Sequence, residues 1–71
     1  MMNEKDEFMI FCLESYKSKK KISGKKAYDI FNKYGVFTYL TEFYDTLHTT
    51  GYQYINKDID IYLEARGYVA V

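Results

Sequence analysis

Two side chains in this sequence could perform nucleophilic chemistry, Cys12 and His48, and each is the only residue of its type in the chain. A thiol and an imidazole act together only when both lie in a cleft, beside a third group that orients the imidazole. Cys12 lies inside the longest apolar run, Phe8 to Leu13, where a free cysteine usually behaves as a small buried hydrophobe. We therefore expect Cys12 to be a core residue without a catalytic role.

Other arrangements that support catalysis are missing from the sequence. Asp58 and Asp60 are two positions apart, so on a helix their carboxylates point in different directions and cannot share a proton. There is no glycine-rich phosphate loop, no nucleophile elbow and no sequence cluster of metal ligands. We predict a protein that is not an enzyme and that has no catalytic residue, no cofactor and no metal site.

His48 has two interpretations, because it lies near the end of a predicted helix and at the edge of that helix's apolar stripe. In the first, the ring hydrogen-bonds a nearby carbonyl or carboxylate and packs against Tyr44 or Tyr52, while the helix dipole favours its charged form. In the second, His48 is a recognition residue on an edge that faces a partner. Both interpretations stay open from the sequence.

The formal net charge of zero hides three blocks of charge, with −3 over residues 1–16, +6 over 17–33 and −3 over 34–71. The lysines of the middle block could contact phosphates. Base-specific DNA binding is disfavoured, because the chain has one arginine. If the second and third predicted helices formed a helix-turn-helix, the recognition helix would also carry Glu42 and Asp45, which repel phosphate. The candidates for electrostatic docking of an acidic protein or a nucleic acid are Lys17, Lys19, Lys20, Lys21, Lys25 and Lys26.

Aromatic residues make up 20% of the chain, with nine tyrosines and five phenylalanines. Several fall at the edges of apolar stripes or in loops, where they either extend a thin core or anchor a partner. The candidate interaction residues are Tyr39, Tyr44, Asp45, His48, Thr49, Tyr52, Tyr54 and Asp58.

Hydrophobic spacing predicts four helices, separated by glycine-centred breaks, at about residues 3–20, 24–34, 37–49 and 55–65. Ser23 is expected to cap the second helix, and Gly35 to end it in a left-handed conformation. The clearest apolar stripe belongs to the third helix and consists of Val36, Leu40, Phe43, Tyr44 and Leu47.

These elements predict one all-α domain over residues 1–71, a compact four-helix orthogonal bundle. We expect the first helix to be central and the most buried, and residues 68–71 to form a short extended tail that either lies in a groove or frays. The longest apolar run, six residues, is too short to span a membrane, and no secretory signal is expected. A single cysteine allows no internal disulfide and favours a reducing compartment, so we expect a cytoplasmic protein.

Two stretches of the sequence resemble a known family. The first is the run Glu7 to Glu14, together with Ser23-Gly24, Tyr28 and Phe31. The second runs from Phe43 to Gly51 around the core Tyr44-Asp45-Thr46-Leu47-His48-Thr49, and continues in Gln53-Tyr54-Ile55 and Asp58-Ile59. Over nearly its whole length the chain is similar to a family of small bacterial proteins of unknown function, numbered 3791.

The resemblance implies a context and no chemical mechanism. Members of this family are typically encoded beside proteins of a second uncharacterised family that looks like ADP-ribosyltransferases, which suggests an antitoxin-like or immunity-like companion. We predict a non-catalytic protein-interaction domain that binds a protein partner, such as that transferase-like protein, or a second copy of itself. The alternative is a nucleic-acid-associated helical domain that uses the lysines at the junction of the first two helices.

Overall fold

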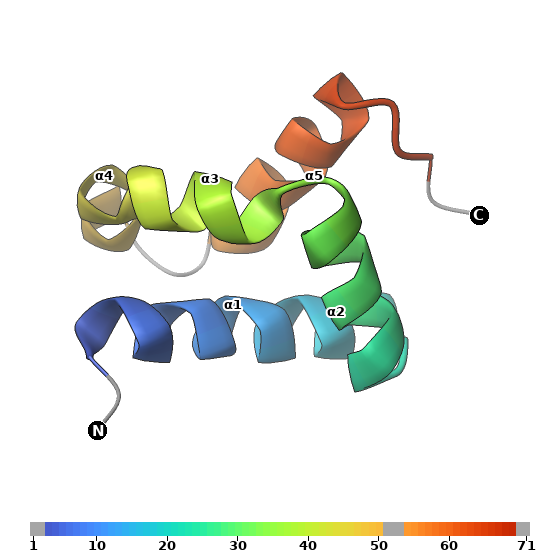
Figure 1. Cartoon of the computed structure of the whole chain (residues 1–71), viewed down its shortest axis with the longest axis horizontal. Coiled ribbons are helices and arrows are strands. Elements are labelled where there is room, and N and C mark those ends of the chain that lie inside the picture. The colour runs from blue at the N-terminus through green and yellow to red at the C-terminus, as the bar shows by residue number, and fades with distance from the viewer. Residues whose placement is uncertain (1–2, 51–53, 70–71) are drawn as a thin grey trace.

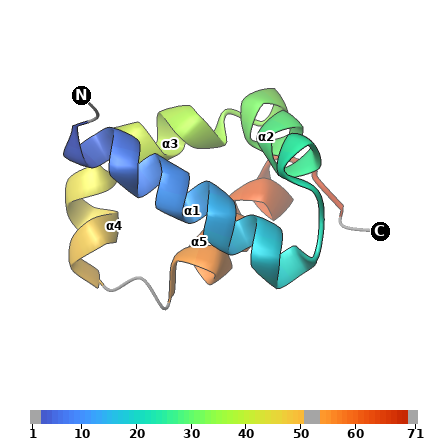
Figure 2. The same ribbon diagram turned by 90° about the horizontal axis from the view of Figure 1, so that it is seen from below.

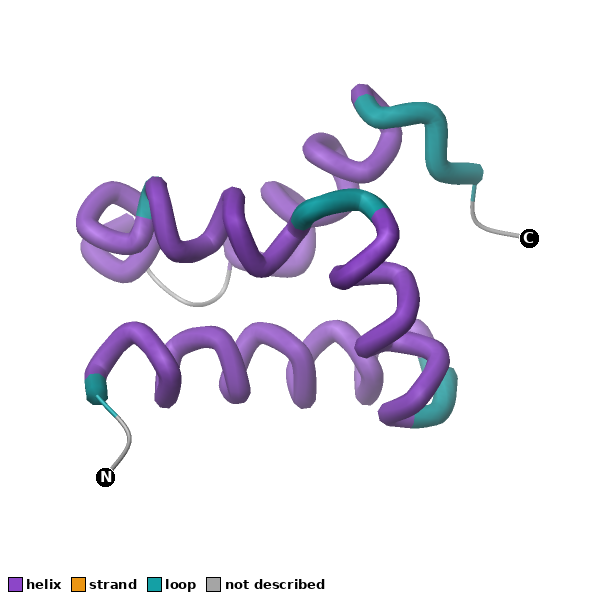
Figure 3. The backbone as a smooth tube through the Cα atoms, viewed as in Figure 1, coloured by secondary structure: helices purple, strands orange, loops and turns teal. Residues whose placement is uncertain are grey.

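The computed structural model describes residues 3–50 and 54–69, and every regular element in these ranges is a helix (Figure 1). The predicted all-α class is therefore confirmed. The helices are α1 (Glu4–Lys20), α2 (Gly24–Lys33), α3 (Val36–Glu42), α4 (Tyr44–Thr50) and α5 (Ile55–Ala65). The connections between α1 and α2, α2 and α3, and α3 and α4 are short (Figure 3).

The first helix is held at both ends by local hydrogen bonds. At its start, the Asn3 side chain accepts from the Asp6 backbone N–H at 2.9 Å and the Asp6 carboxylate accepts from the Asn3 N–H, which together form a capping box. At its end, Lys21 adopts a left-handed conformation with φ 56°, and the Ile22 N–H donates to the Lys17 carbonyl at 3.2 Å. The chain therefore changes direction at Lys21 and Ile22 and leads into the next helix.

Helix α1 packs against all four other helices, which confirms its predicted central position in the fold. It is not enclosed by them, however, because α2 to α5 cover one side of it and α1 lies in front of them in Figure 2. Phe8, Cys12 and Tyr16 face the other helices and are buried, whereas Ile10 and Phe11 are 47% and 41% exposed. The expectation that α1 is the most buried helix is wrong.

Both ends of α2 form as the sequence predicts. The Ser23 hydroxyl accepts from the Lys26 N–H at 3.1 Å and caps the start of α2. Gly35 follows the end of α2 with φ 72°, a conformation that costs a glycine little because it has no Cβ. The Tyr62 hydroxyl of α5 donates to the carbonyls of Tyr34 and Gly35, at 3.1 and 3.3 Å, and so ties α5 to this turn.

The predicted helix at 37–49 is two helices, so the described part of the chain forms five helices where the periodicity predicts four. The break is at Phe43, whose φ of −106° and ψ of 21° leave the helical range. Just before it, the Thr41 hydroxyl donates to the Phe37 carbonyl at 2.9 Å, a bond that competes with the backbone ladder and bends helices. Phe43 was predicted to face inward and is 49% exposed, because the break interrupts the helical phase on which that prediction depends.

Helix α5 ends in a Schellman motif around Gly67, which has φ 91°. The Tyr68 N–H donates to the Leu63 carbonyl at 3.0 Å, and the Gly67 N–H to the Glu64 carbonyl at 3.1 Å. Beyond it, Tyr68 and Val69 have no regular structure, and the Tyr68 ring packs edge-on against Tyr34 at 5.4 Å between centroids. The rest of the predicted tail, residues 70–71, lies outside the described residues.

The core lies between α1 on one side and α3 and α5 on the other, with α2 closing one end (Figure 1). All of its members are apolar or aromatic, and burial of such side chains is the main term that favours folding. The buried side chains are Phe8, Cys12, Tyr16, Ala27, Ile30, Phe31, Val36, Leu40, Leu47, Ile55, Ile59 and Leu63.

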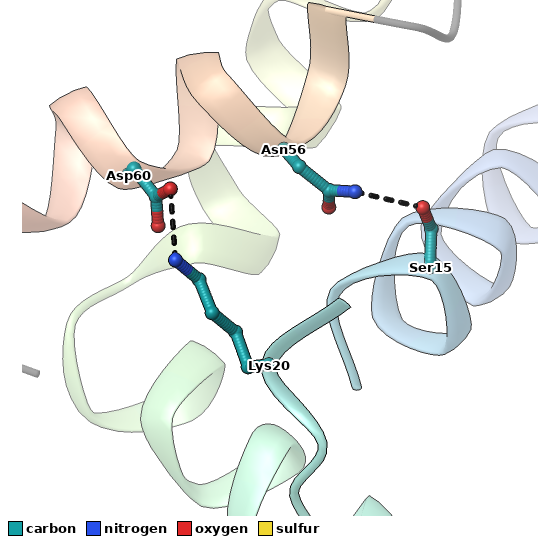
Figure 4. Close-up of polar contacts among 4 residues, drawn as sticks. All are labelled: Ser15, Lys20, Asn56 and Asp60. Atoms are coloured by element: carbon teal, nitrogen blue, oxygen red, sulfur yellow. Dashed lines mark hydrogen bonds and ion pairs between the residues drawn. The ribbon is translucent and has the colours of Figure 1, made fainter. Parts of the chain in front are cut away.

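Polar contacts join the far ends of the chain across the α1–α5 interface (Figure 4). Lys20 Nζ lies 3.0 Å from Asp60 Oδ2, and Asn56 Nδ2 donates to Ser15 Oγ at 3.0 Å. The Asn56 Oδ1 atom is buried and has no hydrogen-bond partner among the described residues. These contacts fix the position of α5 along α1.

The left-handed Lys21 generates a stability prediction. A lysine pays a steric penalty at positive φ that glycine avoids, so Lys21→Gly should raise the free energy of unfolding by about 0.5–1 kcal/mol. The matched control is Lys19→Gly in the last turn of α1, which should lower it by about 0.5–1 kcal/mol. Urea denaturation measures both, and a Lys21→Gly variant as unstable as Lys19→Gly would contradict this conformation.

Candidate functional site

A groove of about 370 Å³ lies between the N-terminal half of α1 and α4. We refer to it as the α1–α4 groove. Helix α1 supplies two carboxylates and two phenyl rings, and α4 supplies a phenol and an imidazole. Its lining residues are Glu4, Glu7, Phe8, Phe11, Tyr44 and His48.

The aromatic wall of this groove is a stacked pair. The rings of Tyr44 and His48 lie one turn apart on α4, with centroids 4.4 Å apart and planes inclined by 7°. The rings of Phe8 and Tyr44 pack edge to face, with centroids 5.2 Å apart. His48 Nδ1 lies 2.9 Å from the Tyr44 carbonyl oxygen, and because that oxygen only accepts, the bond places a proton on Nδ1. The ring thus has the position that the helix-terminal interpretation predicts.

The opposite side of the α1–α4 groove is acidic. The Tyr44 hydroxyl is 3.5 Å from Glu4 Oε2, and Glu7 lines the groove one turn further along α1. Lys5 Nζ lies 6.0 Å from the Tyr44 ring centroid, at the outer limit of a cation–π contact. Aromatic faces beside carboxylates suit a cationic group, which both attract.

A second groove, of about 360 Å³, flanks α1 on its other side, where it meets α2 and α3. We refer to it as the α1–α3 groove. It is mostly apolar, and it is lined by Asp6, Met9, Ile10, Leu13, Tyr28 and Phe37. Phe11 lines the α1–α4 groove and Ile10 lines the α1–α3 groove. Both lie on the exposed side of α1, and we refer to the two side chains together as the apolar ridge.

The structure brings together only some of the candidate interaction residues. Tyr44 and His48 share the α1–α4 groove, and Asp45 lines a shallow depression beside it. The Thr49 hydroxyl is used within α4, where it donates to the carbonyls of Asp45 and Thr46 at 2.8 and 2.9 Å.

The remaining candidates that the structure describes lie elsewhere. Tyr54 is exposed just before α5, and Tyr52 lies outside the described residues. Tyr39 and Asp58 belong to the α3–α5 side of the molecule, so the predicted tyrosines are spread over more than one surface.

Tyr39 lies in a hollow between α3 and α5 that already contains a cation. Its ring stacks on Tyr62 at 4.3 Å, and the Arg66 guanidinium carbon lies 4.8 Å from the centre of the Tyr62 ring. Burial raises the pKa of the Tyr39 hydroxyl, and the negative charge of Asp58 raises it further. Both effects keep Tyr39 neutral, as a packed aromatic residue rather than an ionised group.

Three of the six candidate docking lysines contact carboxylates of the chain itself. Lys17 Nζ lies 2.8 Å from Glu14, Lys20 Nζ lies 3.0 Å from Asp60, and Lys25 Nζ lies 3.3 Å from Asp29. The others, Lys19, Lys21 and Lys26, are exposed around the end of α1 and the start of α2. The lysine block is therefore partly neutralised by the fold.

Sequence reasoning missed the α1 side of the candidate site, namely Glu4, Glu7, Ile10 and Phe11. A signal for the apolar ridge was present, because six consecutive apolar residues extend around more of a helix than one face can bury. Glu4 and Glu7 lie opposite α4 because the helix breaks at Phe43. The sequence has no proline or glycine at this point that would indicate a break.

The residues considered for catalysis do not form a reactive site. Cys12 is completely buried in the core, and His48 lies at the surface groove. Among residues 3–50 and 54–69, no three His, Cys, Asp or Glu side chains gather closely enough to hold a metal ion. None of the helices within these ranges is both long and apolar enough to cross a membrane.

A family model described as "Protein of unknown function (DUF3791)" matches residues 7–66. The chain belongs to this family. The match confirms the resemblance drawn from the sequence, and it includes the apolar ridge, α4 and most of both grooves. No curated protein and no solved structure matches this DUF3791 chain, so its fold and grooves are interpreted from its own geometry.

The buried thiol generates the second prediction. Burial raises the pKa of Cys12 from 9.0 to about 12, so iodoacetamide at mildly alkaline pH should label the folded protein far more slowly than the protein in urea. The folded state binds this proton more tightly than the unfolded state does. Its contribution to stability is therefore complete below about pH 9 and is lost as the pH rises towards 12.

A control variant distinguishes the contribution of Cys12 to the alkaline loss of stability from that of Tyr16, which is also in the core. Burial also raises the pKa of Tyr16, to about 12, so Cys12→Ala should make the alkaline decline in the free energy of unfolding shallower without abolishing it. Thermal or urea unfolding across this pH range measures the effect. Rapid labelling of the folded protein would contradict the core position of Cys12.

Proposed function

We propose that this protein is a non-catalytic protein-interaction domain, and that it binds its partner through the apolar ridge and the two grooves beside it. The observation that supports this most directly is the exposure of Ile10 and Phe11, at 47% and 41%, side by side on one helix. An exposed aromatic and an aliphatic side chain bordered by grooves are typical of an interface centre.

The surroundings of the ridge also fit an interface. Glu7 and Glu14 are exposed one turn before and one turn after it, and they supply the polar rim that surrounds most interface centres. Tyr28 is exposed in the α1–α3 groove, and Tyr44 lines the α1–α4 groove. Tyrosine adds contact area at low entropic cost, since it has only two side-chain torsions.

Nucleic-acid binding through the lysines is the weaker candidate. The charges of Lys17, Lys20 and Lys25 are offset by carboxylates within 3.3 Å, which lowers the number of cations available to replace counterions on phosphates. The exposed Lys19, Lys21 and Lys26 could still steer an acidic protein toward the α1–α2 junction. A gel-shift series at increasing salt would reveal nucleic-acid binding as an affinity that falls steeply with salt concentration.

The partner that we propose is the ADP-ribosyltransferase-like protein whose gene typically neighbours those of this family, with this chain as its antitoxin-like or immunity-like companion. The family context motivates this choice, and the apolar ridge supplies a surface for it. Coexpression and copurification of the two proteins tests the pairing directly.

The third prediction concerns the ridge in that complex. The double variant Ile10→Ser, Phe11→Ser should weaken binding by at least about 2 kcal/mol, because it removes both anchors from the interface centre. The matched control is Ile61→Ser on α5, which changes a side chain that is 55% exposed and distant from the ridge in sequence. Circular dichroism checks that both variants are folded, because the side chains of Ile10 and Phe11 also contribute some buried area.

Isothermal titration calorimetry measures these affinities. Equal weakening by the ridge variant and by Ile61→Ser would remove the ridge from the interface. Failure of the two wild-type proteins to associate at micromolar concentration would contradict this partner.

A further inference from the structure

We infer that the segment of the partner that lies on this surface is amphipathic and basic, with an apolar side chain on the ridge and a lysine or arginine in the α1–α4 groove. This inference rests on the proposed function, and it adds the chemistry of the partner.

The charges around the ridge are carboxylates. Glu7 and Glu14 are exposed on the same face of α1 as Ile10 and Phe11, one turn before and one turn after them. Glu4 and Glu7 line the α1–α4 groove, and Asp6 lines the α1–α3 groove. A segment that covered the ridge would therefore meet negative charge along most of its border.

Cations of the chain offset this charge only in part. Lys17 pairs with Glu14 at 2.8 Å and offsets its charge. Glu4 and Glu7 line the α1–α4 groove and still contribute negative charge there. Lys5 faces the Tyr44 ring at 6.0 Å, and His48 stacks on that ring. Opposite charge on a partner would improve both the association rate and the choice of partner.

The molecule contains an internal example of the contact that we infer. In the hollow between α3 and α5, Tyr62 stacks on Tyr39, and its ring centre lies 4.8 Å from the guanidinium carbon of Arg66, one helical turn later in the chain. Glu42 lines the same hollow.

The α1–α4 groove repeats this combination of stacked rings and carboxylates, with Tyr44 and His48 beside Glu4 and Glu7. In this groove, Lys5 Nζ lies 6.0 Å from the centre of the Tyr44 ring. A guanidinium or ammonium group from a partner could approach more closely.

A second copy of this chain fits the surface poorly. If two α1 helices met antiparallel at the ridge, Glu7 of one copy would face Glu14 of the other, and in a parallel pair each Glu7 would face its equivalent. The parallel arrangement places like charges together, which opposes association. In the antiparallel arrangement Glu7 meets a carboxylate that Lys17 already pairs, so this contact offers Glu7 little attraction. The same carboxylates repel the phosphates of a nucleic acid.

The experiment uses two synthetic helical peptides as probes. Both carry leucine at the i, i+3, i+4 and i+7 positions of one face, and the remaining positions are lysine in one peptide and glutamate in the other. Fluorescence anisotropy with the full chain should show binding of the lysine peptide, with an affinity that falls about tenfold or more between low and high salt. The glutamate peptide should bind at least about tenfold more weakly than the lysine peptide.

Matched variants locate the binding site. Glu4→Gln with Glu7→Gln should weaken binding of the lysine peptide about tenfold. Glu42→Gln with Glu64→Gln makes the same change in net charge at two exposed carboxylates on α3 and α5, and should leave the affinity within about twofold. Amide NMR signals should shift along Glu7–Glu14 and Tyr44–His48, and the same spectra report whether each variant is folded.

Three results would overturn the inference. They are equal weakening by the two double variants, equal binding of the two peptides, and a dimer of the chain in sedimentation that Ile10→Ser dissociates. If the transferase-like protein binds through the ridge but is insensitive to Glu4→Gln with Glu7→Gln, the proposed function holds and the basic partner chemistry is wrong. If the lysine peptide binds as expected and the transferase-like protein does not associate, the choice of partner is wrong and the chemistry of the surface holds.

Discussion

One helix provides the surface on which the rest of this small molecule folds. Phe8, Cys12 and Tyr16 lie along one side of α1 and contribute to a core that all four other helices share. A chain of 71 residues has too few elements to cover both sides of such a helix. The apolar run of α1 is nevertheless long enough to extend beyond the buried side, so Ile10 and Phe11 remain in contact with solvent. The core and the candidate interaction surface are thus two sides of the same hydrophobic segment.

Features set by local chemistry could be predicted from the sequence. Serine is one of the residues preferred just before a helix, where its hydroxyl accepts from a backbone N–H of the first turn, so Ser23 was identifiable as the cap of α2. Gly35 was identifiable as the left-handed residue after α2, because few other residues adopt that conformation cheaply. The inward positions of Ile55, Ile59 and Leu63 follow from the helical period and are all buried.

Features that depend on competition between local interactions could not be predicted in the same way. The hydroxyl of Thr41 bonds the backbone one turn earlier, and Phe43 then leaves the helix. Threonine occurs in many continuous helices, so its presence did not indicate a break. Lys21 takes a left-handed conformation although a glycine stands three positions later, because the Ile22 N–H bonds back to Lys17 and completes the turn. Of the candidate site, Tyr44 and His48 were identified, whereas Glu4 and Glu7 join them only through the packing of α4 on α1.

The stacking of His48 on Tyr44 has a consequence for how fast and how tightly this surface can bind. Both rings belong to one short helix, and the imidazole is further held by the Tyr44 carbonyl at 2.9 Å. Two side chains that would otherwise rotate freely are therefore already ordered before any encounter. Since freezing a mobile side chain at an interface costs about 0.5–1.5 kcal/mol, this rigid wall reduces the entropy lost on association. Docking here can then proceed close to a rigid-body encounter, with little rearrangement of the groove.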